Sequence, residues 1–168
     1  EVIEFNDDIK TLAQDMLTTM YDAPGIGLAA QQIGINKRIF VLDVNYDREI
    51  QHTEDGGETV DLDNLKPVVF INPVIKAKTG DTTYQEGCLS LPGVFEDIQR
   101  AEKIVVEYHD VDGDKHELEA DGLLSICIQH ENDHLNGVTF LNYLSQFKKN
   151  FYKQQLIHKV NRQDFKYL

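Results

Sequence analysis

Residues 129–135 read QHENDHL, and the fold of the chain can be worked out from this heptapeptide outward. It contains the pattern H-E-x-x-H, in which His130 and His134 are four residues apart. Side chains at this spacing project from one face of an α-helix, so the two imidazoles can bind the same metal ion. Glu131 lies beside them, where it can accept a proton from water held at that ion. The alternative is a surface helix that carries two solvated histidines.

The residues around this motif predict a buried helix. Asp121 is a suitable N-cap residue, and Gly137 stands where a helix commonly ends. Between them the apolar residues are not confined to one stripe, which is typical of a helix buried on most sides. These apolar residues are Leu124, Ile126, Cys127 and Ile128.

A catalytic zinc-type site needs a third protein ligand and an open position for water. The extended pattern H-E-x-x-H-x-x-G-x-x-H is not completed, because its third histidine would fall at Phe140. No glutamate follows Glu131, so a downstream carboxylate ligand is also excluded. The third ligand must come from upstream or from His158. Cys127 precedes His134 by seven residues. This spacing is roughly 10 Å along a helix axis, so we interpret Cys127 as a packed core residue.

The other cysteine, Cys88, lies in residues 85–93, which read QEGCLSLPG. The glycine before it and the Pro-Gly pair after it predict little regular structure, so backbone groups can approach a ligand closely. Alone, Cys88 would be interpreted as a buried structural thiol. Beside the histidine helix it is the natural thiolate ligand, and a Cys-His-His set leaves one metal position open.

Three separated motifs in this chain resemble those of the bacterial-type peptide deformylase family. They are GIGLAAQQ at residues 25–32, EGCLS at 86–90 and QHENDHL at 129–135. The resemblance runs from about Glu1 to the end of the chain. It implies a metallohydrolase of protein biosynthesis that removes the N-formyl group from the initiator methionine of nascent peptides, a step in N-terminal methionine processing. It also implies Fe²⁺ as the native ion, with Zn²⁺, Ni²⁺ or Co²⁺ in purified protein.

The same resemblance implies roles for residues outside the metal site. The Gln32 side-chain amide and the Leu89 backbone N–H would donate hydrogen bonds to the formyl oxygen, while Glu131 acts as base and then as acid. Substrate-binding positions would include backbone groups and an apolar pocket for the methionine side chain. These positions are Ile26, Gly27, Gly87, Leu123 and Ile126. From the residues alone, segment 25–34 would be only a close-packed turn.

Composition narrows the class of protein. The formal charge of −13 argues against general DNA or RNA binding, which needs a basic surface. No apolar run reaches the length of a membrane span, and no signal peptide is visible. Two cysteines, one of them a predicted ligand, fit a reducing cytoplasm rather than a disulfide framework. The family resemblance implies that this cytoplasm is bacterial. Two other functions remain as alternatives: a different metal-dependent peptidase or amidase that uses the same residues, and a non-catalytic metal-binding module.

The order of the predicted elements indicates an α+β fold in a single domain over residues 1–168. We expect a buried central metal-binding helix surrounded by mostly antiparallel β-sheets, with an N-terminal and a C-terminal helix. The predicted elements are a helix at 6–21 capped by Asn6, strands at 38–44, 68–72 and 74–78, and a hairpin of 104–109 with 115–119. Residues 45–66 are expected to form a long acidic loop. Relatives usually begin further upstream, so we expect an N-terminal leader to be missing.

The C-terminal segment, residues 145–168, has the opposite charge to the rest of the chain. It holds six of the sixteen Lys and Arg residues, and from Lys148 onward Asp164 is the only acid. A solvated basic helix is one interpretation. The other is a docking helix that guides an acidic protein to ribosomal RNA near the nascent-chain exit. The six basic residues are Lys148, Lys149, Lys153, Lys159, Arg162 and Lys166.

Overall fold

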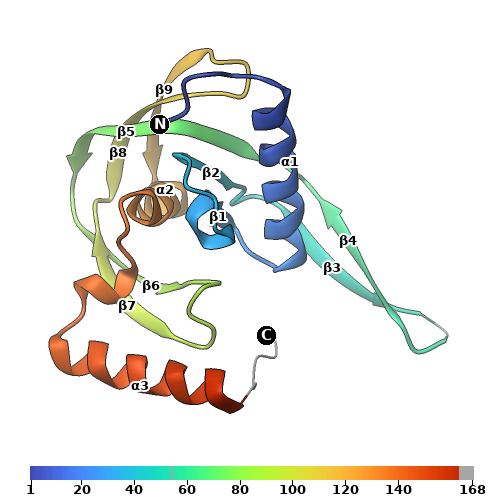
Figure 1. Ribbon diagram of the computed structural model, residues 1–168, viewed down its shortest axis with the longest axis vertical. Helices are drawn as coiled ribbons and strands as arrows, with labels where there is room; N and C mark the ends of the chain where they lie inside the picture. Colours follow the sequence, from blue (N-terminus) through green and yellow to red (C-terminus); the bar gives the residue numbers. More distant parts are fainter. Residues whose placement is uncertain (54, 163–168) are drawn as a thin grey trace.

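The structure, a computed structural model, describes residues 1–53 and 55–162. An antiparallel sheet in the order β1-β2-β5-β8-β9 curves around helix α2, and α1 lies along the β1–β2 side (Figure 1). The α+β prediction is confirmed. The helices are α1 (Asp7–Asp22), α2 (Gly122–Leu135) and α3 (Gln146–Arg162), with short 3₁₀ turns at Ala30–Ile33 and Phe140–Tyr143. The strands are β1 (Gly27–Ala29), β2 (Ile39–Leu42), β3 (Asp47–His52), β4 (Glu58–Asp63), β5 (Val68–Thr79), β6 (Thr82–Gly87), β7 (Phe95–Arg100), β8 (Lys103–His109) and β9 (Lys115–Asp121).

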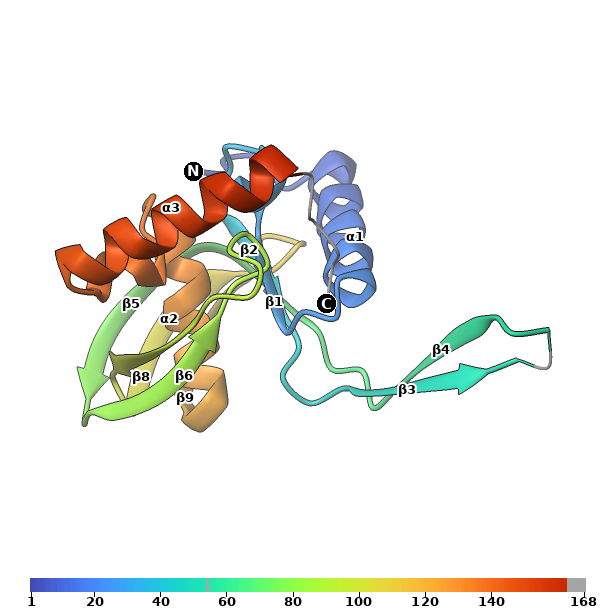
Figure 2. The ribbon, with the colours of Figure 1, turned by 90° about the horizontal axis from the view of Figure 1, so that it is seen from below.

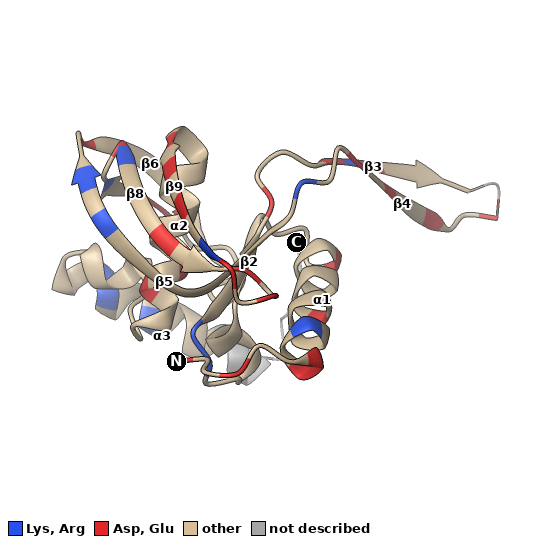
Figure 3. Ribbon diagram, turned by 90° about the horizontal axis from the view of Figure 1, so that it is seen from above, with Lys and Arg blue, Asp and Glu red and all other residues tan. Residues whose placement is uncertain are grey.

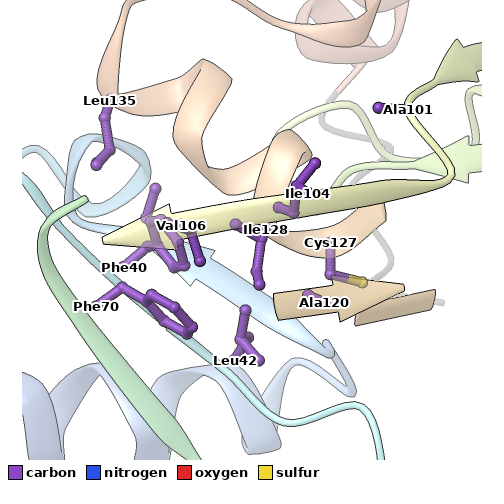
Figure 4. Close-up of a cluster of buried hydrophobic side chains, with 11 residues drawn as sticks. Phe40, Leu42, Phe70, Ala101, Ile104, Val106, Ala120, Cys127, Ile128 and Leu135 are labelled. Carbon is purple, nitrogen blue, oxygen red and sulfur yellow. The ribbon is translucent and has the colours of Figure 1, made fainter. Parts of the chain in front are cut away.

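Helix α2 is the buried helix that the sequence predicts. Ile128 is fully buried, and the helix packs on the concave side of the sheet against Phe40, Phe70 and Val106 (Figure 4). Gly137 ends the helix with a φ of 71°, a left-handed conformation that glycine adopts without steric cost. The N-terminal end of helix α2 differs from the prediction in one respect. Asp121 occupies the N-cap position, but its side chain makes no capping hydrogen bond, because the chain enters the helix directly from strand β9.

Helix α1 buries its apolar stripe against β1 and β2. The predicted cap is confirmed, since the Asn6 side chain accepts a hydrogen bond from the Ile9 backbone N–H. Met16 and Met20 are fully buried and pack with Ile39 and Val41 of β2. The stripe is therefore core packing. A smaller apolar cluster lies beneath α3, around Val94, Ile98 and Phe140.

Residues 45–66, which the sequence predicted to be a long acidic loop, contain two paired strands instead. Strands β3 and β4 form a two-stranded ribbon that projects from the body (Figure 2), and acidic residues lie along it (Figure 3). Its pairs include Ile50 with Val60, and Gly56 turns at the tip with a φ of 83°. Alternation is hard to detect in this segment, because both faces of an isolated ribbon are exposed and charged residues replace most apolar ones.

The base of this ribbon is held by one buried carboxylate. Asp43 Oδ1 accepts from the Asn45 N–H at 3.0 Å, and Asp43 Oδ2 accepts from the Lys66 N–H at 2.7 Å. The Tyr21 hydroxyl also donates to Oδ2, at 2.8 Å. Asp43 is fully buried, so these bonds fix both ends of the ribbon against the body.

Two other strand predictions change. The break expected at Pro73 is a register shift between Ile71 and Val74 inside one continuous strand, β5, because a bulge accommodates a residue without an N–H. The hairpin β6–β7 lies in a region for which little regular structure was predicted. The hairpin β8–β9 and helix α3 are confirmed, although residues 163–168, including Lys166, and the side chains of Lys159 and Arg162 lie outside the described part. Within residues 1–53 and 55–162, no helix has the length and apolarity needed to cross a membrane.

Candidate metal centre

Two elements bring three ligand atoms together. Cys88 directly follows strand β6, while His130 and His134 lie one turn apart on α2. Cys88 Sγ lies 3.3 Å from His134 Nε2, and the two Nε2 atoms are 3.2 Å apart. All three donor atoms lie within 4.8 Å of one another. The residues that the sequence nominated as a ligand set therefore converge on one point.

This arrangement fits a tetrahedral divalent cation. Bonds of about 2.0 Å to nitrogen and 2.3 Å to sulfur at tetrahedral angles require N···N and S···N separations of roughly 3.3 and 3.5 Å. The separation of the two Nε2 atoms, 3.2 Å, and that of Cys88 Sγ from His134 Nε2, 3.3 Å, lie within a few tenths of an ångström of these values. Burial opposes ionisation of the Cys88 thiol, but its hydrogen bonds with His130 and His134 lower its pKa to about 6. The donor set therefore includes the thiolate that a borderline-soft cation prefers.

The other two ligand candidates lie elsewhere. Cys127 packs in the main core, where burial raises the pKa of its thiol well above the ordinary value, and it is not part of the ligand group. This agrees with its interpretation as a core residue. His158 is exposed on α3.

Glu131 points its carboxylate into the same site. Its exposed fraction is 5%, and its Oε2 atom has no hydrogen-bond partner among the described residues. Burial raises the pKa of Glu131 to about 7, although the neighbouring histidines partly oppose this shift. A carboxylate with this pKa and a free oxygen is suited to exchanging protons near neutral pH. Gly27 of β1 packs directly on this side chain, since a Cβ at Gly27 would overlap Glu131 Oε1.

The side-chain amide of Gln32 also faces the metal centre. Its Oε1 accepts from the Ala29 N–H at 2.8 Å, which directs Nε2 toward Ser90 Oγ at 3.1 Å and Cys88 Sγ at 3.5 Å. The amide orientation is thus set by the backbone of the 3₁₀ turn that carries it. A donor held in this way can stabilise negative charge that develops beside the ligands.

A pocket of about 400 Å³ opens over the metal centre. It is lined by the loop after α1, the end of β6, the Cys88 loop and the first turns of α2. All the substrate-binding positions expected from the sequence lie in its wall, together with the two expected oxyanion donors: Ile26, Gly27, Gly87, Leu123 and Ile126, with Gln32 and Leu89. The pocket wall also includes two aromatic side chains that were not predicted from the sequence, Tyr84 and Phe95.

Sequence reasoning missed a buried charge network behind the ligands. Glu86 Oε2 accepts from His130 Nδ1 at 2.8 Å, and the Arg100 guanidinium binds both oxygens of Glu86. Arg100 also binds Asp133, which lies on the same helix as the two histidine ligands. Glu86 lies in the quoted EGCLS motif, but Arg100 lies on a strand that was not predicted. Hydrogen bonds from Arg100 and His130 lower the pKa of Glu86 despite its burial.

The fold, the Cys-His-His group beside a buried glutamate and the pocket over them together define a metal-dependent hydrolase. The polypeptide deformylase family profile matches residues 1–150. The peptide deformylase of Rhizobium meliloti is 50% identical over 143 residues, which cover 84% of this chain and 74% of that protein. Peptide deformylase 2 of Xanthomonas axonopodis pv. citri is 46% identical over 147 residues, or 88% of this chain and 77% of that protein.

Solved structures agree with these relatives. The peptide deformylase of Ehrlichia chaffeensis superimposes with a TM-score of 0.83 and 37% identity, covering 98% of this chain and 90% of that one. That of Legionella pneumophila gives a TM-score of 0.82 and 38% identity, covering 98% and 88%. This chain belongs to the polypeptide deformylase family. Its function is therefore the metal-dependent removal of the N-formyl group from the initiator methionine of newly made proteins.

Proposed function

We propose that deformylation takes place at the centre formed by Cys88, His130 and His134, with Fe²⁺ as the native ion. The observation that carries this proposal is the convergence of the three donor atoms within 4.8 Å at the base of the pocket. A thiolate with two imidazoles also accepts Zn²⁺, Ni²⁺ or Co²⁺, so purified protein can carry another ion. The preference for iron rests on resemblance to the family.

Glu131 is the proton carrier in this proposal. When bound, the ion supplies Lewis-acid chemistry that acidifies water and polarises the formyl carbonyl. Glu131 accepts the proton released by that water and later delivers it to the leaving amine, acting first as base and then as acid. Its unpaired Oε2 and its burial support this role, because a hydrogen-bonded, solvated carboxylate would be a weaker base.

Gln32 and Leu89 stabilise the charge that develops on the formyl oxygen. The Gln32 Nε2 group faces the centre, and the Leu89 N–H lies one residue beyond Cys88. A preorganised donor of this kind contributes roughly 3 kcal/mol to transition-state stabilisation. The methionine side chain would lie against Ile26, Leu123 and Ile126, and the backbone at Gly27 and Gly87 would align the peptide.

Two kinds of substrate and four metal forms of the protein test this proposal. The protein, purified without oxygen, should release formate from formyl-Met peptides and leave internally cleavable peptides intact. Cleavage of the internal peptides would favour a different peptidase or amidase. The iron form should lose activity in air as iron or Cys88 oxidises, while nickel or cobalt forms should remain active. An aerobic zinc form as fast and as durable as the anaerobic iron form would contradict the iron assignment.

We also propose a bacterial cytoplasmic location, because the substrates are nascent peptides. The match of one family profile to residues 1–150 supports a single catalytic domain spanning residues 1–168. We further propose that the basic C-terminal helix contacts the ribosome near the nascent-chain exit. Lys153 is exposed on α3, whereas Lys148 is paired with Glu96 and is less available. Removing residues 145–168 should weaken salt-sensitive co-sedimentation with ribosomes. Unchanged co-sedimentation would leave α3 as a solvated helix.

A further inference from the structure

Arg100 is the last residue of strand β7, and its guanidinium is enclosed between two carboxylates. Its exposed fraction is 5%, and among the described residues it is not one of those that line the pocket over the metal centre. Arg100 Nε donates to Glu86 Oε1 at 2.6 Å and Nη2 donates to Glu86 Oε2 at 2.9 Å. Nη1 donates to Asp133 Oδ2 at 2.6 Å. The Arg100 side chain therefore donates three hydrogen bonds to two carboxylates.

The first of these carboxylates, Glu86, binds the metal ligand His130 directly. Glu86 Oε2, held by Arg100, also accepts from His130 Nδ1. With its proton on Nδ1, His130 presents the lone pair of Nε2 to the other ligands, and the ring cannot rotate without losing the bond to Glu86. Glu86 also lies two residues before Cys88, so the same contact fixes the end of β6 from which the thiolate ligand emerges.

The second carboxylate, Asp133, connects Arg100 to helix α2. Asp133 immediately precedes His134, and its Oδ2 accepts both from Arg100 and from the Tyr143 hydroxyl at 2.8 Å. The Tyr143 ring lies against the guanidinium, 4.8 Å from its carbon. The β6 strand and helix α2, which supply ligands independently, are thus joined through one cation.

We propose that Arg100 is a positioning residue, which sets the separation between the Cys88 thiolate and the two histidines and so determines metal affinity and coordination geometry. Only a planar guanidinium can bind one carboxylate through two N–H groups and a second carboxylate through a third. A lysine would keep the charge but would hold at most one acid well. The inference rests on the ligand assignment of the proposed function.

The test measures metal binding rather than turnover alone. Arg100→Lys should weaken Co²⁺ and Zn²⁺ binding by about 10- to 100-fold in chelator competition, the range expected for loss of a ligand-orienting contact. The visible absorption of the cobalt form should change in shape, because the ligand geometry changes. Arg38→Lys is the matched control, since Arg38 also binds the end of α2, through Leu135 O and Asn136 Oδ1, but touches neither Glu86 nor Asp133. It should leave affinity and spectrum unchanged.

A second variant removes the risk of misfolding. Leaving Glu86 and Asp133 buried without their cation is costly, so Arg100→Met should be combined with Glu86→Gln and Asp133→Asn. This neutral triple variant, folded by circular dichroism, should show the same loss of affinity as Arg100→Lys. Wild-type affinity and cobalt spectrum in both variants would overturn the proposal. If Cys88→Ser also binds metal normally, the ligand assignment itself fails, and the two failures are distinguished.

Discussion

Replacing Gly27 by alanine should slow catalysis far more than it destabilises the fold. The new Cβ would overlap Glu131 Oε1 and lie 2.9 Å from Glu131 Cδ and 3.0 Å from Cγ. Gly27 is held in β1 by pairing with Leu42, so the strand is less able to yield than the end of the glutamate side chain. The carboxylate must therefore move away from the position in which it faces the metal centre.

The expected magnitudes separate the two effects. A positioned general base contributes about 10²- to 10⁴-fold to the rate, which corresponds to roughly 3–5 kcal/mol at 1.36 kcal/mol per tenfold change. An extra methyl group in a packed site costs about 1–3 kcal/mol of stability. For a domain of this size, each kcal/mol lowers Tm by about 2–4 °C. We expect kcat to fall by at least about 100-fold in a protein that remains folded at assay temperature.

The assay is deformylation of a formyl-Met peptide, measured with metal content and thermal unfolding. Gly57→Ala is the matched control, because its Cβ also overlaps the end of a flexible side chain, Thr53 Oγ1 at 2.8 Å, but on the ribbon tip. It should leave kcat unchanged. A Gly27→Ala enzyme with full metal content and kcat within about threefold of wild type would refute the close coupling between Gly27 and a proton-carrying Glu131.

Three further predictions concern the metal centre and α3. Cys88→Ser should lose most metal and activity, whereas Cys127→Ser should chiefly lower Tm; the reverse pattern would exclude Cys88 as the ligand. Glu131→Gln should keep metal and peptide affinity while kcat collapses, and near-normal turnover would remove Glu131 from the mechanism. Hydrogen bonds from α3, first from Lys148, hold the pKa of Glu96 below its ordinary 4.5, so this contact stabilises the fold above that pH and is lost as pH falls through the lowered pKa. The protection factors of the α3 amides, corrected for the intrinsic exchange rate at each pH, should then fall on acidification below about pH 4.5 in wild type but not in Glu96→Gln, and equal protection profiles would contradict this.

Much of the ligand set could be predicted because it depends on local spacing. The helical interval between His130 and His134 fixes their common face, and the lack of downstream ligands directed attention to Cys88. The Asn6 cap and the β8–β9 hairpin could also be predicted, because both depend on short-range geometry.

The parts that could not be predicted depend on contacts between distant segments. Arg100 is one arginine among sixteen basic residues, and nothing near it in the chain indicates that it will meet Glu86 and Asp133. The same is true of the pairing between β6 and β7, because their sequences are mostly polar and Ile98 of β7 packs with residues of distant segments, such as Phe140. A bulge concealed the continuity of β5 at Pro73.

The clamp formed by Asp43 makes the ribbon a convenient site for engineering. Because Asn45 and Lys66 are tied to the same buried carboxylate, the chain leaves and re-enters the body at nearly one place. Loop-closure entropy grows only slowly with length, so the segment between these residues can be lengthened at a cost of about 0.6 kcal/mol per doubling. A fluorescent domain or an affinity tag placed at Gly56 and Gly57 would extend outward from the ribbon tip, leaving the enzyme free to work on a solid support.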